Sequence, residues 1–117
     1  MANPNIVNVA TIYGQTAVLL CSTSPANVVV NGAASNTVVK LDSLYCSNGD
    51  NLAGYAVTID LFRSSTAYNV ASSITVPSGA TLDVLSKQIW LQEGDALRAY
   101  SNTASKITVV CSYEVIG

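Results

Sequence analysis

The sequence predicts an all-β protein: an antiparallel β-sandwich of about eight or nine strands, in a jelly-roll-like or immunoglobulin-like layout. Three observations lead to this fold class. Apolar and polar residues alternate with a period of two, as along 55–61 and 107–115. Turn residues, such as Pro77-Ser78-Gly79, interrupt the alternation about every ten residues, a spacing typical of sandwiches and barrels. Glu, Lys and Arg are too few for amphipathic helices.

Turn residues divide the first half of the chain into four expected strands. The turns are expected at Tyr13-Gly14-Gln15, Ser24-Pro25-Ala26, Asn31-Gly32-Ala33 and Ser47-Asn48-Gly49-Asp50. The strands between them are expected at 5–12, 15–22, 26–30 and 37–47. The Asn-Gly pairs at 31–32 and 48–49 suit turns in which the backbone needs a positive φ.

Alternation is clearest in the second half of the chain. Tyr55, Val57, Ile59 and Leu61 form one apolar face, and the segment 107–115 repeats the pattern. The β-branched and aromatic residues in this half of the chain favour strands over helices. The strands of this half are expected at 54–63, 67–76, 80–86, 88–92, 96–101 and 105–116, with some of the short ones merging.

Length and composition predict one domain, spanning 1–117. The 117 residues match the usual size of a domain with a single hydrophobic core, and no linker or low-complexity tract divides them. Half of the residues are hydrophobic and only 10% are charged, so the chain is not expected to be disordered. Apolar faces left over after folding mark interfaces, and the composition therefore favours a homo-oligomer.

Charge and hydropathy exclude two classes of partner. The net charge is −2 and the basic residues are scattered, whereas nucleic-acid binding needs a basic stripe. The basic residues are Lys40, Arg63, Lys87, Arg98 and Lys106. The longest apolar runs are far shorter than the roughly 20 residues of a membrane-spanning helix. The first residues lack the basic and apolar segments of a secretory signal, so we expect synthesis in the cytoplasm.

The three cysteines, Cys21, Cys46 and Cys111, show no C-x-x-C spacing. A zinc site prefers four ligands, and the chain has no histidine to complete one, so we expect no metal and no cofactor. The cysteines lie in or beside apolar segments, which predicts three reduced and mostly buried thiols. One disulfide with one remaining free thiol is the alternative.

No catalytic site is expected, and the chain is predicted not to be an enzyme. Without histidine it lacks the commonest general base and the Ser-His-Asp and Cys-His arrangements. Glu93 and Asp95 flank Gly94 and could form a carboxylate pair or bind calcium. A tight hairpin with solvated acidic tips explains them better.

Large side chains on the polar side of a strand are the candidate interface residues. Alternation along 88–92 turns Trp90 outward. Trp90 then either lies under a second packed face or anchors an interface, where tryptophan and arginine dominate binding hot spots. Phe62 and Arg63 admit the same two interpretations, and Arg98 completes the set of candidates.

The six tyrosines offer an alternative function, because aromatic faces can stack on sugar rings. Their positions mostly continue the apolar registers, so core and rim positions explain them better than a carbohydrate-binding platform. They are Tyr13, Tyr45, Tyr55, Tyr68, Tyr100 and Tyr113.

Four segments, 1–9, 60–68, 89–98 and 110–116, carry a resemblance that extends over essentially the whole chain. They read MANPNIVNV, DLFRSSTAY, IWLQEGDALR and VCSYEVI. The sequence resembles a family of small virion structural proteins of tailed phages that infect marine bacteria, especially cyanobacteria.

The resemblance implies a virion structural protein without enzymatic activity, synthesised in the bacterial cytoplasm. It favours a capsid decoration or cement protein at the capsid surface, bound to the major capsid protein or other virion proteins, and a homo-oligomer, preferably a trimer. A tail, neck or fibre component, such as a receptor-binding module for carbohydrate, is the alternative. The family offers no functional-site residues to transfer.

Overall fold

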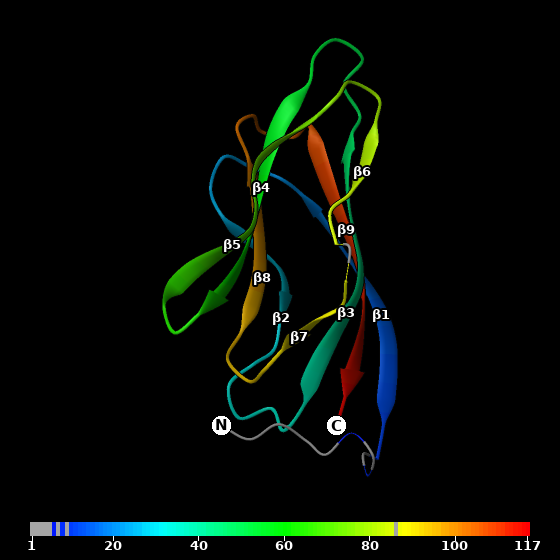
Figure 1. Cartoon of the computed structure of the whole chain (residues 1–117), viewed down its shortest axis with the longest axis vertical. Helices are drawn as coiled ribbons and strands as arrows, with labels where there is room; N and C mark the ends of the chain where they lie inside the picture. The colour runs from blue at the N-terminus through cyan, green and yellow to red at the C-terminus, as the bar shows by residue number, and fades with distance from the viewer. Residues whose placement is uncertain (1–5, 7, 9, 86) are drawn as a thin grey trace.

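The computed structural model describes residues 6, 8, 10–85 and 87–117, and these residues form nine β-strands (Figure 1). The strands are β1 (Ile12–Leu20), β2 (Ala26–Val30), β3 (Val38–Asn48), β4 (Tyr55–Arg63), β5 (Thr66–Val76), β6 (Thr81–Asp83), β7 (Ile89–Leu91), β8 (Ala96–Ser101) and β9 (Ile107–Ile116). Two antiparallel sheets pack face to face, which confirms the predicted all-β sandwich.

The strand order is that of a jelly roll. Sheet A has the order β1-β9-β3-β6, with β7 also on β3, and sheet B has the order β2-β8-β4-β5. β6 pairs with Tyr45–Ser47 of β3 and β7 with Val39–Leu41, so the two lie end to end as one interrupted strand. Counted in this way, eight strands form two four-stranded sheets with the connectivity of a double-sheet jelly roll, the first of the two layouts expected.

The core lies between the two sheets and is made mainly of aliphatic side chains. Fully burying one such side chain contributes about 1.5–3 kcal/mol. The buried cluster comprises Cys21, Val29, Val39, Leu41, Leu44, Cys46, Val57, Ile59, Val76, Leu85, Leu91, Leu97, Ala99, Ile107, Val109 and Cys111. The alternation read from the sequence therefore identifies the inward faces of the long strands.

The predicted turn at Tyr13-Gly14-Gln15 is wrong, because these residues lie inside β1. β1 pairs with β9 without interruption, from Ile12 opposite Ile116 to Leu20 opposite Thr108. That pairing satisfies the backbone groups of Tyr13 and Gln15, whereas those of Gly14 face away from β9. Of the strand expected at 5–12, Ile12 is in a strand, as the first residue of β1, whereas residues 6, 8, 10 and 11 are not; residues 5, 7 and 9 lie outside those described.

The two Asn-Gly pairs do not supply the expected positive φ. Among the described glycines, Gly79 and Gly94 have positive φ, whereas Gly32 and Gly49 do not. Asn31 and Asn48 instead have buried side chains. They lie after β2 and at the end of β3, at opposite ends of the sandwich (Figure 1). Each asparagine therefore fixes a strand end through its side chain.

Candidate interaction surfaces

Trp90 lies on the outer face of sheet A, as the alternation predicts. On β7, Leu91 is buried, while Trp90 keeps 40% of its surface exposed. The register places Trp90 beside Lys40 of β3, and Lys40 beside Glu114 of β9. The Lys40 Nζ lies 3.6 Å from a carboxylate oxygen of Glu114. Trp90 is thus an exposed aromatic side chain next to a cation whose charge is partly neutralised.

Further apolar side chains share this face. Val18, Val110 and Tyr45 form one row across β1, β9 and β3, and Leu20 begins the next row. Val18 is 69% exposed, Leu20 55% and Tyr45 40%. We call Val18, Leu20, Tyr45 and Trp90 the sheet A surface. Trp90 lies in the row of Lys40 and Glu114, and the row of Thr16, Ser112 and Ser43 separates it from Val18 and Tyr45. Exposed apolar side chains gathered on one face of a sheet are typical of interfaces.

Phe62 and Arg98 meet on the outer face of sheet B. The register of β4 with β8 places Asp60 opposite Arg98. The Arg98 guanidinium donates to both Asp60 oxygens, at 2.9 and 3.2 Å, and its carbon lies 4.0 Å from the centroid of the Phe62 ring. Asp60 is only 2% exposed. Arg98 therefore has a partner for its charge within its own chain, and Phe62 covers the ion pair.

Arg63 binds Asp95 in the turn between β7 and β8. Its Nε lies 2.8 Å from Oδ1 of Asp95, whose Oδ2 accepts the Gln92 N–H at 2.8 Å. The backbone N–H of Asp95 closes the turn by donating to the Gln92 carbonyl at 3.0 Å. The predicted tight hairpin with solvated acidic tips is wrong: the turn joins β7 of sheet A to β8 of sheet B, and Glu93 and Asp95 are buried. The loop after β2 covers Glu93, which accepts the Asn36 N–H.

The pKa of Asp95 is held below its ordinary value. Burial by itself raises that pKa, but the hydrogen bonds from Arg63 and from the Gln92 N–H more than offset it. Because the folded-state pKa is depressed, the stabilisation is present above the unfolded pKa of about 3.9 and is lost as the pH falls through the folded value.

We therefore expect the wild-type chain to lose stability below about pH 4, and Asp95→Asn to lose less over the same interval. The variant should be less stable than the wild type at neutral pH, since Arg63 loses its carboxylate. Urea unfolding at pH 7, 4 and 3 measures both effects. Equal pH slopes for the two proteins would contradict this account of Asp95.

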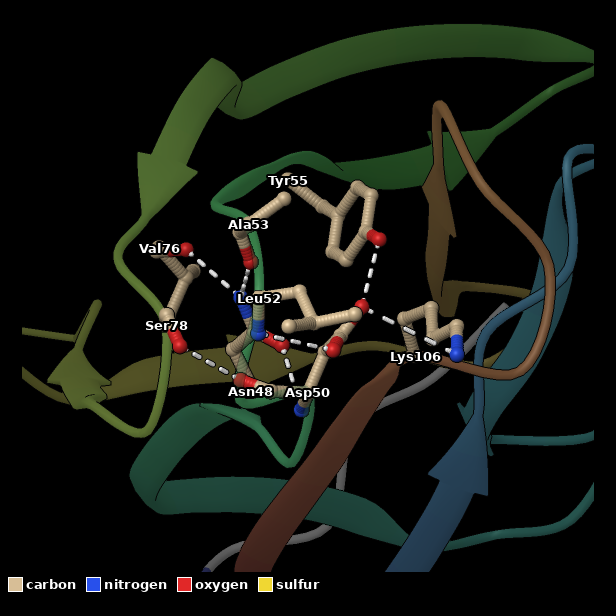
Figure 2. Close-up of polar contacts among 8 residues, drawn as sticks. All are labelled: Asn48, Asp50, Leu52, Ala53, Tyr55, Val76, Ser78 and Lys106. Atoms are coloured by element: carbon tan, nitrogen blue, oxygen red, sulfur yellow. Dashed lines mark hydrogen bonds and ion pairs between the residues drawn. The ribbon is translucent and has the colours of Figure 1, made fainter.

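The loop between β3 and β4 forms a polar network around Asn48 and Asp50 (Figure 2). Asp50 accepts the Tyr55 hydroxyl at 2.5 Å and the Leu52 N–H at 3.0 Å, and it lies 3.8 Å from the Lys106 Nζ. The Tyr55 hydroxyl is the main cause of a lowered Asp50 pKa, and the same hydrogen bond raises the pKa of Tyr55. The carboxylate is thus occupied in shaping its own loop.

A polar groove of about 240 Å³ runs beside this loop. It is lined by Leu20, Ser47, Gly49, Asp50, Ser105, Lys106 and Thr108. The two charged groups of the lining, Asp50 and Lys106, pair with each other at 3.8 Å. Within the described part of the chain, no three His, Cys, Asp or Glu residues gather as a metal site would require.

All three cysteines are reduced and buried, as predicted. Burial raises the pKa of Cys21 to about 11, that of Cys46 to about 12 and that of Cys111 to about 11. Such thiols stay protonated at neutral pH and act as small apolar side chains. No helix among the described residues has the length and apolar character that crossing a membrane requires.

The exposed tyrosines do not form one platform. Tyr45 lies on the outer face of sheet A, whereas the alternation of β1 turns Tyr13 toward the opposite face. Tyr68 lies in the hairpin of β4 and β5, which projects from sheet B (Figure 1). A sugar stacked on one of them would not reach the others.

The structure separates the four candidate residues into three places. It brings Phe62 and Arg98 together on sheet B, holds Arg63 at the β7–β8 turn and leaves Trp90 on sheet A. The exposed side of β1 contains none of the four candidate residues. The sequence does carry a signal for this surface, since no Asp, Glu, Lys or Arg precedes Lys40 and the exposed side chains of β1 are therefore uncharged.

Comparisons with known proteins show similarity of fold. No protein-family model matches the sequence, and no curated protein is similar to it at the sequence level. A chain in the acid-stable capsid of the Helicobacter pylori bacteriophage KHP30 superposes with a TM-score of 0.53 at 10% identity, covering 94% of this chain and 90% of that one. A chain of the disulfide-linked pili that form Bacillus endospore appendages gives 0.52 at 16% identity, covering 91% and 88%.

Proposed function

We propose that this protein is a non-enzymatic structural component of a phage virion, and specifically a decoration or cement protein on the capsid surface. The observation that carries the proposal is the sheet A surface, an area on the outer face of sheet A where a tryptophan and three further apolar side chains are exposed. Partner binding is the function that such an area supports. The fold similarity to a phage capsid chain and to a pilus chain agrees with a role in assemblies.

The proposed partners are the major capsid protein and further copies of this chain, with a trimer as the stoichiometry to test first. Trp90 is the proposed anchor. Phe62 and Arg98 form a second proposed contact, in which the Arg98 side chain keeps 19% of its surface exposed. Arg63, at the β7–β8 turn, is a third, and its side chain keeps 39% of its surface exposed. Because both arginines are already paired, they would contribute packing and hydrogen bonds more than unpaired charge.

Replacing Trp90 with alanine should separate binding from folding. We expect the unfolding free energy to fall by only about 1 kcal/mol, because the ring is partly exposed, while affinity for expanded empty shells falls at least about 30-fold, which corresponds to a hot spot of 2 kcal/mol. Co-sedimentation with shells and urea unfolding measure the two effects. Tyr68→Ala, on the β4–β5 hairpin, is the matched control and should bind normally. A Trp90→Ala chain that does not fold would argue for the packed-face interpretation.

The competing proposal is a tail, neck or fibre component that binds host polysaccharide. Copy number distinguishes the two: a decoration protein should be present in numbers comparable with the major capsid protein, whereas a tail module should be present in a handful of copies. Quantitative mass spectrometry of purified virions gives that ratio. A glycan array supplies the second criterion, since a cement protein should bind none of its sugars.

A further inference from the structure

Among the described edge strands, β1 differs from the others because it has no feature that prevents pairing with another chain. Bulges, short length and charged side chains normally protect sheet edges. β2 and β5 each contain register irregularities, and β6 and β7 have three residues each. β1 has nine residues, continuous register, no proline and no charged side chain. In Figure 1 it forms the outermost strand on its side of the molecule.

The backbone groups of β1 that face away from β9 can be assigned from its two ends. The Thr11 carbonyl accepts the Gly117 N–H at 3.0 Å, and the Cys21 N–H donates to the Ile107 carbonyl at 2.8 Å. Odd-numbered residues therefore bond to β9, and hydrogen-bonding direction alternates along an antiparallel strand. The N–H and C=O groups directed to the free edge belong to Ile12, Gly14, Thr16, Val18 and Leu20.

We propose that this edge pairs with β1 of a second copy of the chain, antiparallel about a two-fold axis at Thr16. In this register Thr16 lies opposite Thr16 of the partner subunit, and Ile12 lies opposite Leu20 of the partner subunit. All nine residues of each strand are then paired. Each even-numbered pair then exchanges both of its N–H···O bonds. Sheet A would continue across the axis into sheet A of the second copy.

Side chains in this register complement one another. On the outer face Ile12 meets Leu20 of the partner subunit, Val18 fills the space left by Gly14 of the partner subunit, and the two Thr16 side chains are adjacent. On the inner face Tyr13 meets Leu19 of the partner subunit and Gln15 meets Ala17 of the partner subunit. Apolar residues thus pair with apolar ones, large with small, and no charge faces a like charge. The strand complements its own reversed copy, which is why a second copy is the occupant.

The two-fold contact makes even-numbered assemblies. By itself it gives a dimer, and it would join trimers in pairs if the proposed trimer forms through another surface. The proposed β1 pairing does not depend on the proposed function, because the purified chain can form the contact without any other virion protein. A chain absent from virions could still dimerise, and a virion protein could still lack this contact, so the two proposals fail separately.

Val18→Lys tests the edge. Val18 is 69% exposed, so the substitution should leave the monomer fold intact while placing a lysine in the paired edge, and we expect the dimer dissociation constant to rise about 100-fold. Val30→Lys is the matched control, an exposed valine on edge strand β2, and it should dimerise like the wild type. Analytical ultracentrifugation across a concentration series gives the dissociation constants.

Cysteine cross-linking tests the register. Thr16→Cys should form a disulfide between two copies under mild oxidation, because opposite residues in a hydrogen-bonded pair have Cα atoms about 5.5 Å apart, within disulfide range. Gly14→Cys is the register control. An added Cβ at Gly14 meets no atom within 4 Å in the monomer, yet the two cysteines would lie about 13 Å apart along the strand. The three native thiols are buried and should not interfere.

The proposal predicts a wild-type dimer, a weakened Val18→Lys dimer and cross-linking at 16 but not at 14. A wild-type chain that stays monomeric at millimolar concentration would overturn it. So would a Val18→Lys dimer as tight as the Val30→Lys dimer. Cross-linking at 14 in preference to 16 would overturn the register and with it the pairing described.

Discussion

Arg98→Ala should destabilise the fold by about 3 kcal/mol, because it leaves the Asp60 carboxylate buried beside Phe62 without its cation. Removing one member of a buried ion pair typically costs 3–5 kcal/mol, and the partial exposure of the Arg98 side chain favours the lower value. Water can approach the site once the long side chain is gone, which limits the cost further. Urea unfolding with a fixed m-value measures the change.

A double-mutant cycle separates the ion pair from packing. Asp60→Ala together with Arg98→Ala should cost less than the sum of the two single changes, because the double variant leaves no unpaired buried charge. Lys87→Ala, an exposed basic residue away from the pair, controls for the loss of a positive charge and should change stability by less than about 0.5 kcal/mol. A cost below 1 kcal/mol for Arg98→Ala would show that the pair contributes little beyond its surroundings.

Asn48→Ala should cost about 3 kcal/mol and loosen the β3–β4 loop. The Asn48 amide donates to the carbonyls of Ala53 and Val76 at 2.9 and 3.0 Å, and its oxygen accepts the Asp50 N–H at 3.0 Å (Figure 2). Alanine leaves the buried Val76 carbonyl without this donor, and each unsatisfied buried group costs about 1–3 kcal/mol. Thermal unfolding and hydrogen exchange of the loop amides measure the loss.

Asn51→Ala is the matched control, an exposed asparagine in the same loop, and it should be within about 0.5 kcal/mol of the wild type. Asn48→Asp tests the donors alone, since it keeps the acceptor and the shape but cannot donate to either carbonyl. We expect it to destabilise at least as much as alanine at neutral pH. If Asn48→Asp were neutral, the amide donors would not be the source of the stability.

Local chemistry made most of the fold predictable. Alternation along 107–115 is set by the two faces of a strand, and Val109 and Cys111 are buried as that pattern requires. The same rule placed Trp90 outward. It failed at Gly14, which is typical of a turn but lies inside β1, because its neighbours Tyr13 and Gln15 pair with strand β9, about a hundred residues away in the chain.

Taken alone, the sequence determined an all-β sandwich with buried thiols and without histidine, because these properties follow from composition and from a two-residue period. Only the tertiary structure decided that Arg98 forms an ion pair with Asp60 and Arg63 with Asp95. The same is true of Asn48, at the end of β3, whose side chain donates to the carbonyl of Val76 at the end of β5. These contacts join residues 28 to 38 positions apart, and strand order brings them together. Strand order also placed β1, which has no charged side chain, at the edge of sheet A.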